Sequence, residues 1–198
     1  MIRFYILSFL LEFVLISAQS YHRATMGEYF IDWKVIGACP QEKRGTDEIL
    51  TDVRVTKRNR KAEVIGNVTY KIPFDDTISA KFNFAVLGSN LAWLPNAYSL
   101  TFPKACSGFS NMMGPIWIDL LKHMKMSTKC PTPKGVYIMS GYDVDSLLRN
   151  SAFPKQFIYG RYKITIEFLN NKNALLGCSY FIVDVLPLWQ KKKHSGTE

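Results

Sequence analysis

Apolar and polar residues alternate with a period of two along most of this 198-residue chain. The clearest run spans residues 162–168, where Ile164 and Ile166 alternate with Lys163 and Thr165. Successive side chains of a β-strand point to opposite faces of its sheet, so this pattern predicts strands with one buried face. Turns rather than helices separate most of these runs. The sequence therefore predicts a mainly β, antiparallel sandwich or cup.

Four further runs share the alternation, and the phase of each run predicts its inward face. The asparagine-rich turn 170–173 separates the run above from the last strand and predicts a hairpin. The basic cluster 57–61 lies between two runs and predicts a second turn. The predicted inward sets are Tyr29, Ile31, Trp33 and Val35; Val64, Gly66, Val68, Tyr70 and Ile72; Ile78, Ala80, Phe82, Phe84 and Val86; and Phe181, Val183 and Val185.

One segment departs from this pattern and has helical spacing. Its apolar residues recur at intervals of three and four, as on the buried stripe of an amphipathic helix. Pro115 would disrupt a helix interior but suits the first helical position. We therefore expect one short helix over about Pro115–Met126, preceded by a looser turn. The stripe consists of Phe109, Met112, Met113, Ile116, Trp117, Leu120, Leu121 and Met124.

Residues 1–20 have the layout of a secretory signal peptide, with Arg3 near the start, a mostly apolar run and then small residues. A membrane anchor is the alternative, but Glu12 splits the run and leaves too little for a span of roughly 20 apolar residues. We therefore expect a secreted, extracellular protein. Its residues 21–190 should form a single domain, and residues 191–198 should form a basic, disordered tail.

The chain has four cysteines, Cys39, Cys106, Cys130 and Cys178, which would meet an oxidising environment after secretion. We expect two disulfides, and the residues alone leave all three pairings open. No C-x-x-C spacing occurs, so neither a zinc site nor a thioredoxin-like motif is expected. The sequon that begins at Asn67 predicts a glycan on that asparagine.

The chain is basic, with 25 lysines and arginines against 16 aspartates and glutamates and a formal net charge of +9. Its basic residues cluster at 57–61 and 191–193. Solvated turns and tails commonly carry such clusters. A more specific hypothesis is transient contact with a membrane surface or receptor through anionic lipid head groups or acidic glycans. Nucleic acid is not an expected partner of a secreted chain.

Motifs of catalysis and metal binding do not occur in the sequence. The G-x-S-x-G, H-E-x-x-H, P-loop and G-x-G-x-x-G patterns are missing, and two of the three histidines lie near the chain ends. The third, His123, is expected to be exposed near a helix end, and the segment 143–145 to form a turn rather than a calcium site. We therefore expect no enzymatic activity, no cofactor and no metal. A triad assembled from distant positions is the alternative.

The second half of the chain carries an ordered set of short motifs. In this order they resemble the ganglioside-activator branch of the ML lipid-recognition superfamily, and more closely its secreted insect members, the chemosensory B-type proteins. The resemblance covers roughly residues 106–186, and before it only Cys39 and the strand rhythm agree. The motifs are Cys130-Pro131, Gly135-Val136-Tyr137, Gly160-Arg161-Tyr162-Lys163-Ile164 and Leu176-Gly177-Cys178.

The resemblance implies a β-cup in which antiparallel strands surround a central apolar cavity for lipid tails. It also implies that Cys39 pairs with Cys178, and that Cys106 pairs with Cys130 to join the ends of the helical segment near the cavity mouth. A sandwich packed without a void is the competing expectation, because both interiors are apolar. The expected cavity lining is Phe82, Phe84, Val86, Ile164, Ile166, Phe168, Phe181 and Val183. The expected mouth, on a loop and the helix start, is Trp93, Leu94, Phe109, Met112, Met113 and Trp117.

The resemblance further implies lipid binding. Ganglioside activators have eight cysteines and this chain has four, which weakens the case for recognition of a glycolipid head group. We therefore expect a monomeric carrier of a hydrophobic, lipid-like ligand, such as a semiochemical or a cuticular lipid. The alternative is an accessory activator that presents membrane glycolipid to a hydrolase or receptor.

Overall fold

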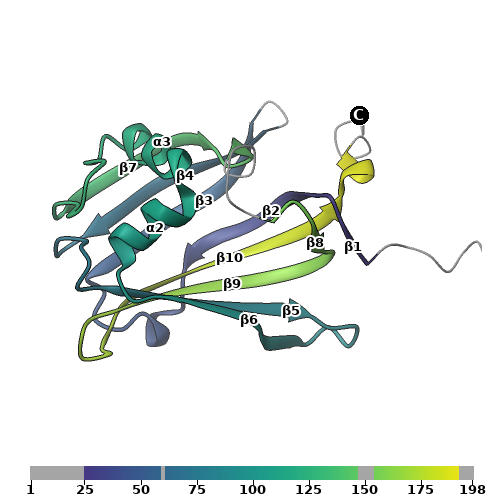
Figure 1. The fold of residues 1–198 in the computed structure, drawn as a ribbon, viewed down its shortest axis with the longest axis horizontal. Helices are drawn as coiled ribbons and strands as arrows, with labels where there is room; N and C mark the ends of the chain where they lie inside the picture. The colour runs from purple at the N-terminus through teal and green to yellow at the C-terminus, as the bar shows by residue number, and fades with distance from the viewer. Residues whose placement is uncertain (1–24, 59–60, 147–153, 192–198) are drawn as a thin grey trace, which may run out of the picture.

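The structure is a computed structural model that describes residues 25–58, 61–146 and 154–191 (Figure 1). The predicted signal peptide and all of the predicted tail except Lys191 lie outside the described residues. The strands are β1 (Met26–Gly27), β2 (Tyr29–Ala38), β3 (Ile49–Arg58), β4 (Lys61–Tyr70), β5 (Ser79–Leu87), β6 (Trp93–Phe102), β7 (Gly135–Asp143), β8 (Phe157–Ile158), β9 (Gly160–Leu169) and β10 (Leu175–Pro187). The helices are α2 (Ala105–Met113), α3 (Pro115–His123) and the short 3-10 helices η1 (Gln41–Lys43) and η2 (Leu188–Gln190).

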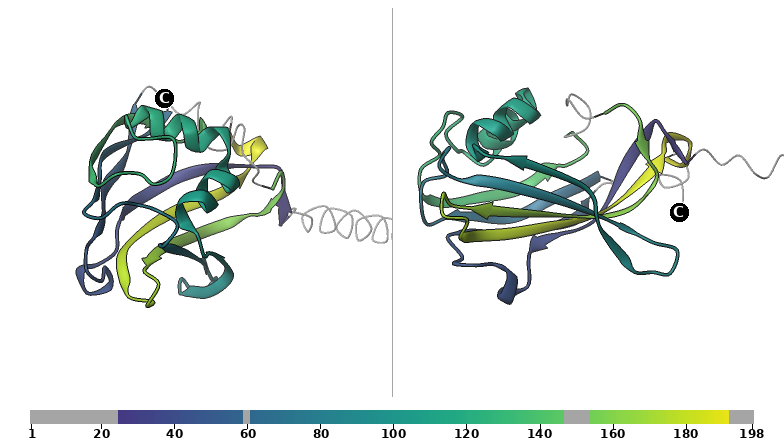
Figure 2. Two further views of the ribbon diagram at one scale, coloured as in Figure 1. Left: turned by 60° about the vertical axis from the view of Figure 1, so that its left-hand side comes forward. Right: turned by 60° about the horizontal axis from the view of Figure 1, so that its bottom comes forward.

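The strands form two main antiparallel sheets. The larger sheet has the strand order β2-β10-β9-β5-β6, the smaller has the order β3-β4-β7, and β1 pairs separately with β8. β3 lies beside β2 at one margin of the interior, while α2 and α3 lie near the edge strands β6 and β7 at the other (Figures 1 and 2). The fold is therefore mainly β and antiparallel, with open sheets that fit a sandwich or cup, as predicted.

The two predicted hairpins are present. The Asn170 side-chain oxygen accepts hydrogen bonds from the backbone N–H groups of Lys172 and Ala174, each at 2.9 Å. Asn173 has a φ of 59°, a left-handed conformation that asparagine tolerates better than most residues. These contacts reverse the chain between β9 and β10. β3 and β4 form the other hairpin, around the basic cluster 57–61.

The predicted phase of β2 is wrong after Trp33. The register between β2 and β10 shifts by one residue at Lys34. Such a β-bulge adds one residue to a strand and reverses the faces of the residues that follow it. Ile36 consequently packs in the core, 7% exposed, where Val35 was expected.

Strand β6 also departs from the prediction, which placed Trp93 and Leu94 on a loop. β6 is an edge strand of the larger sheet, and most of its residues are exposed. Pro95 and a left-handed Asn96, with a φ of 58°, interrupt it near a register shift against β5. An edge strand tolerates proline and a bulge because one side of its backbone has no partner strand. The same interruption hides the alternation that would mark β6 in the sequence.

Two helices occupy the segment where one was predicted. α3 begins at Pro115 as expected, but α2 replaces the looser turn before it. Gly114 separates the two helices with a φ of 56°, a conformation that glycine adopts without steric strain. α3 ends three residues earlier than predicted, because a left-handed Lys125 (φ 55°) closes its last turn.

The interior contains two clusters of buried hydrophobic side chains. The larger cluster joins both main sheets to α2 and α3 and includes Phe74 and Ile78, each 1% exposed. The smaller cluster is centred on Val183 and packs against residues from β2, β5 and β8. Trp33 and Phe181 are half-buried and pack against both clusters. The core thus consists of two packed regions that meet at these two aromatic residues.

The two disulfides have the pairing that the resemblance implies. The Cys39–Cys178 bridge joins the residue that follows β2 to β10, and the Cys106–Cys130 bridge joins α2 to the segment that precedes β7. Their sequence separations are 139 and 24 residues. In the chain-entropy model, loops of these lengths correspond to stabilisation of about 5 and about 3 kcal/mol. The second bridge closes a loop that contains both helices.

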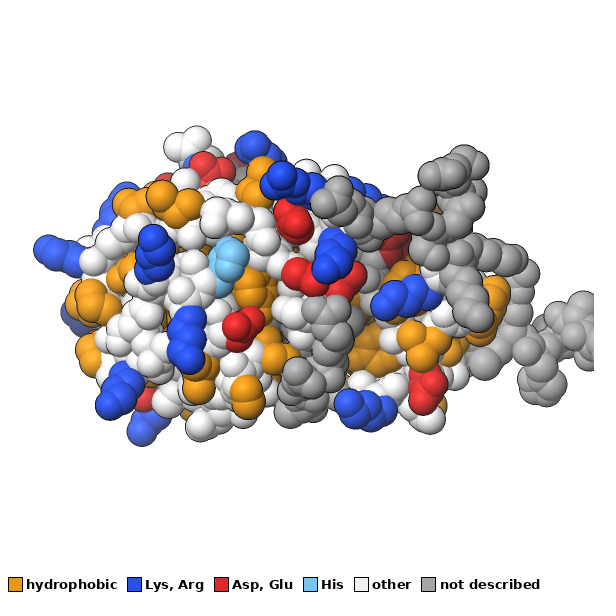
Figure 3. Space-filling model, turned by 90° about the horizontal axis from the view of Figure 1, so that it is seen from above, with side chains coloured by type: hydrophobic (Ala, Val, Ile, Leu, Met, Phe, Trp, Pro, Cys, Tyr) orange, Lys and Arg blue, Asp and Glu red, His pale blue; other side chains and the backbone are white. Residues whose placement is uncertain are grey.

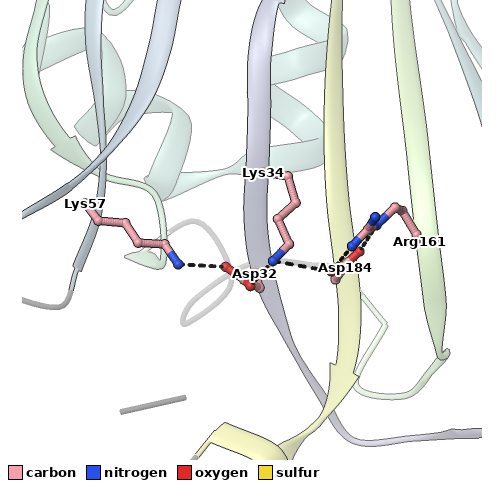
Figure 4. Close-up of polar contacts among 5 residues, drawn as sticks. All are labelled: Asp32, Lys34, Lys57, Arg161 and Asp184. Atoms are coloured by element: carbon pink, nitrogen blue, oxygen red, sulfur yellow. Dashed lines mark hydrogen bonds and ion pairs between the residues drawn. The ribbon is translucent and has the colours of Figure 1, made fainter. Parts of the chain in front are cut away.

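A cluster of charged side chains covers the outer face of the larger sheet (Figure 4). Arg161 donates two hydrogen bonds to the Asp184 carboxylate, from Nε to Oδ1 at 2.6 Å and from Nη2 to Oδ2 at 2.9 Å. Lys34 Nζ lies 2.5 Å from Asp32 and 3.4 Å from Asp184. Lys57 Nζ of β3 lies 3.6 Å from Asp32 of β2. These contacts tie β9, β10 and β2 to the smaller sheet.

The ion pairs lower the pKa of the Asp184 carboxyl. Burial acts to raise the pKa of its carboxyl, but the hydrogen bonds and charges of Arg161 and Lys34 outweigh burial and hold the pKa below its ordinary value of 3.8. Folding therefore favours the ionised form. This contribution to stability is present above the ordinary pKa and is lost as the pH falls through the lowered, folded-state pKa.

Substituting Asp184→Asn should remove this contribution. We expect the free energy of unfolding at neutral pH to fall by about 1–2 kcal/mol, at the low end for charged hydrogen bonds because Arg161 is partly exposed. The variant should also lose less stability than the parent between about pH 5 and pH 2. Urea unfolding across that range measures both effects. The control is Glu167→Gln, which removes an exposed carboxylate on β9 and should have the same stability as the parent at each pH. If Asp184→Asn also had the same stability as the parent at each pH, this account would be wrong.

Candidate functional site

The inner face of the larger sheet is largely apolar, with the buried Ser179 of β10 as a polar exception. Strand register aligns its side chains in rows that cross the strands. We call Phe84 of β5, Ile164 of β9 and Phe181 of β10 the central row, because they lie opposite one another near the middle of the sheet. The next row consists of Val86, Tyr162, Val183 and Trp33.

The central row is partly accessible although it lies in the middle of the sheet. Phe84, Ile164 and Phe181 are half-buried, whereas Phe168 and Val183 on either side are 8% and 1% exposed. A sandwich packed at ordinary core density would bury the middle of its inner face most completely. The central row therefore forms an accessible apolar strip between the two packed clusters. Seen from above, hydrophobic side chains are also visible in the recessed part of the surface beside the helices (Figure 3).

Two side chains of β6 continue the strip to the edge of the sheet. Tyr98 lies opposite Phe84, with 5.4 Å between the ring centroids, and Leu94 lies opposite Val86. Tyr98 and Leu94 are 55% and 50% exposed. Trp93 is adjacent to Leu94 in β6 and so belongs to the opposite face of the strand. Of the two β6 residues that were predicted for the mouth, Leu94 borders the strip and Trp93 does not.

Phe109 lies in the larger cluster rather than at a mouth. It is 6% exposed, and its ring centroid lies between 5.3 and 6.2 Å from the centroids of other aromatic rings. α2 places it against both the sheet and α3, so it fills the space between them. The rings in contact with Phe109 are those of Phe74, Phe82, Phe102, Trp117 and Phe168.

The remaining predicted site residues divide into accessible and buried sets. Met112, Met113 and Trp117 are half-buried on the two helices, and Trp117 packs against the larger cluster. The half-buried residues of the predicted lining are Phe82, Phe84, Val86, Ile164 and Phe181. Its buried residues, which are part of the packed core, are Ile166, Phe168 and Val183.

Trp33 and Tyr98 border the strip but were not among the predicted site residues. The alternation of β2 did assign Trp33 to the inner face, and only the pairing of β2 with β10 brings it beside Phe181. The signal for Tyr98 was hidden, because the irregular segment around Pro95 and Asn96 conceals its strand.

The side chains of the central row and of the next row are uncharged. The phenols of Tyr162 and Tyr29 belong to the smaller cluster or pack against it. Tyr162 donates a hydrogen bond to the Ile158 carbonyl at 3.0 Å, and Tyr29 donates one to the Pro154 carbonyl at 3.0 Å. Burial raises the pKa of both phenols, so each remains a protonated donor. This arrangement suits an uncharged ligand.

The opposite, outer face of the same sheet carries a polar depression of about 490 Å³. Lysine and hydroxyl side chains line it, with Glu167 as its one carboxylate, so its surroundings are basic. It suits a polar or anionic group rather than an acyl tail. The side chains that line it include Lys43, Lys81, Lys163, Thr165, Glu167 and Tyr180.

Asn67 lies on the outer face of the smaller sheet, as its phase predicts. It is half-buried and pairs with Ile138 of β7, and Thr69 Oγ1 donates a hydrogen bond to its Oδ1 at 3.4 Å. Val136 and Ile138 are exposed hydrophobic residues near it. Glycosylation of Asn67 stays a prediction.

The polar groups near α3 form a structural contact. His123 is exposed at the end of α3, as expected, and its ring packs on that of Tyr142 at 5.2 Å. Tyr142 donates a hydrogen bond to Asp119 and accepts one from Ser146, each at 3.1 Å. The segment 143–145 forms a turn, in which the backbone N–H of residue 145 donates to the carboxylate of residue 143 at 3.0 Å. In the ranges that the structure describes, no group of three or more histidines, cysteines and acidic residues is placed to hold a metal ion.

Comparison with known proteins gives no assignment. No family model matches the chain, and a search of curated proteins finds no match. Within the described residues, no helix is both long and apolar enough to cross a membrane.

The different roles of Phe109 and Met112 on α2 can be tested by stability. Phe109→Ala should lower the free energy of unfolding by about 3–5 kcal/mol, because it removes a buried ring from the larger cluster. Met112→Ala, at a half-buried position on the same helix, should lower it by about 1 kcal/mol or less. Thermal and urea unfolding of the two variants make the comparison, and equal losses would show that Phe109 is not part of the packed core.

Proposed function

We propose that the protein is a carrier of a hydrophobic, lipid-like ligand, which binds between the two main sheets against the central row. The observation that carries this proposal is the partial exposure of Phe84, Ile164 and Phe181 in the middle of the inner face, between the buried side chains of Ile166 and Val183. Apolar surface in contact with water is unfavourable by about 25 cal/mol per Å². A ligand that displaces water from this strip gains the corresponding free energy.

The composition of the strip supports a lipid tail as the ligand. Its side chains are aromatic and branched aliphatic, and Met112 and Met113 are half-buried on the helix nearby. Methionine adapts to apolar partners of variable shape. Leu94 and Tyr98 mark the margin at which the strip meets solvent, and so the side from which a ligand enters.

Secretion is part of this proposal. Two disulfides in one chain are typical of an oxidising compartment, and they agree with the signal peptide that the sequence predicts. The resemblance to the ML lipid-recognition superfamily supports the same interpretation. A monomeric extracellular carrier of a semiochemical or cuticular lipid is the form of the proposal that fits these features best.

An accessory activator, which presents membrane glycolipid to a hydrolase or receptor, is the second candidate. The observation in its favour is the β5–β6 hairpin, which exposes Leu91, Leu94 and Tyr98 at one end of a basic protein. Exposed apolar side chains on a basic surface favour contact with anionic membranes.

Filling the strip should block the carrier function. Ile164→Trp adds bulk on the inner face, and we expect it to weaken binding of a fluorescent fatty-acyl probe to delipidated protein by at least about tenfold. Ile182→Trp makes the same change on the outer face of the adjacent strand and should bind the probe like the parent. Fluorescence titration measures affinity, and circular dichroism verifies that both variants are folded. Equal affinities in the two folded variants would place the ligand elsewhere.

Liposomes separate the two candidate functions. A carrier should extract a labelled lipid from neutral vesicles with no partner protein present, because its interior replaces the bilayer around the tail. An accessory activator should bind anionic vesicles through the β5–β6 hairpin and leave the lipid in place. Vesicle sedimentation followed by analysis of the soluble fraction distinguishes these results. Leu91→Ser should reduce vesicle binding in the second case and leave extraction unchanged in the first.

A further inference from the structure

The indole N–H of Trp33 is a buried hydrogen-bond donor without an acceptor. Trp33 lies on the inner face opposite Val183, and its ring meets that of Phe181 edge-on, with 6.2 Å between the centroids. Its Nε1 atom is inaccessible to water and forms no hydrogen bond with a described residue. Tryptophan N–H groups usually find a partner when buried, and each exception calls for an explanation.

Three other polar groups in the described part of the chain, those of Arg44, Asp47 and Tyr162, have a polar partner, which the Trp33 N–H lacks. Arg44 Nε and Asp47 Oδ1 are also buried without a hydrogen bond, but they face each other as an ion pair at 3.5 Å. The phenol of Tyr162, in the same row as Trp33, donates to the Ile158 carbonyl. The fold thus supplies partners at these places, whereas Trp33 packs against both hydrophobic clusters and its N–H has no acceptor among the described residues.

We infer that the ligand carries an uncharged oxygen acceptor, the carbonyl of an ester or ketone, which accepts a hydrogen bond from Trp33 Nε1. This inference rests on the proposed carrier function and names the chemical class of its ligand. Trp33 is half-buried and adjoins the accessible central row through Phe181. A rotation about its side-chain torsions, which have several staggered minima, presents the N–H to a ligand in the strip.

The surroundings select an uncharged acceptor over a carboxylate. A carboxylate taken out of water needs a cation or several donors, and the side chains that share a row with Trp33 or contact its ring supply no cation; they are Val86, Tyr162, Val183 and Phe181. One indole N–H satisfies one carbonyl oxygen. A saturated hydrocarbon would leave the N–H unpaired, so the site discriminates against it.

Strand register indicates where the rest of the ligand lies. Trp33 on β2 contacts Phe181 on β10, and from there the central row crosses β9 to Phe84 on β5. Three strand spacings amount to roughly 14 Å, a distance that an extended tail of about a dozen carbons covers. The carbonyl would therefore lie at the β2 end, with the tail directed toward Tyr98 at the open edge.

Competition between matched ligands tests the inference. Dodecyl acetate and tetradecane, which have similar tails, displace the fluorescent fatty-acyl probe from delipidated protein. We expect the parent to bind dodecyl acetate roughly tenfold more tightly than tetradecane, because one good hydrogen bond changes a dissociation constant by about that factor. Trp33→Phe, which keeps an aromatic ring and removes the N–H, should abolish the preference and retain tetradecane binding. Trp189→Phe, at an exposed tryptophan of η2, is the control and should keep the preference.

A second measurement does not depend on a variant. In ¹⁵N-labelled parent protein, dodecyl acetate should shift the indole N–H resonance of Trp33 downfield, and tetradecane should not. Equal affinity for the two ligands, or an unmoved indole resonance, overturns the inference while leaving the carrier function in place. Failure of the probe and of both ligands to bind overturns the carrier function itself.

Discussion

The pairing of β10 with a strand on each side is the constraint on which the rest of the structure depends. β10 lies between β2 and β9 in the larger sheet. A disulfide from Cys178 holds it to the end of β2, and the ion pair from Asp184 holds it to β9. Its inward side chains Phe181, Val183 and Val185 belong to the two hydrophobic clusters or connect them. A slip of one residue in this register would move Phe181 to the outer face and Asp184 into the core.

The two faces of the larger sheet have opposite chemistry, and this division organises the candidate site. Ion pairs and the polar depression occupy the outer face, while the inner face is largely apolar from β2 to β6. On the inner face, packing is dense at both ends and loose along the central row. Dense ends hold the strands in place, so the middle can remain open to a ligand without collapse of the sheet. A carrier needs this combination of a rigid frame and an unfilled interior.

Much of the fold followed from the sequence, and each departure has a local cause. Alternation identified β9 and β10 on either side of the asparagine turn, because the residues from Tyr162 to Phe168 and from Phe181 to Val185 follow the two-residue period. It failed at Lys34, where a bulge shifts the phase of β2, and around Pro95, where an irregular edge strand does not alternate. Helical spacing marked α3, but the left-handed glycine before Pro115 belongs to a junction between two helices, which spacing alone does not distinguish from a turn.

The sequence by itself determined which way most side chains point, because alternation is a local property of an extended backbone. It placed Ile164, Ile166 and Phe168 on one face without distinguishing among them. Only the tertiary structure decided that the last two are buried in the packed core while Ile164 stays accessible, since exposure depends on what lies across the interior. The tertiary structure also buries Phe109 in the core, where a mouth position was expected, and it leaves the Trp33 N–H without an acceptor. These properties arise from contacts between segments distant in the chain, which no local pattern records.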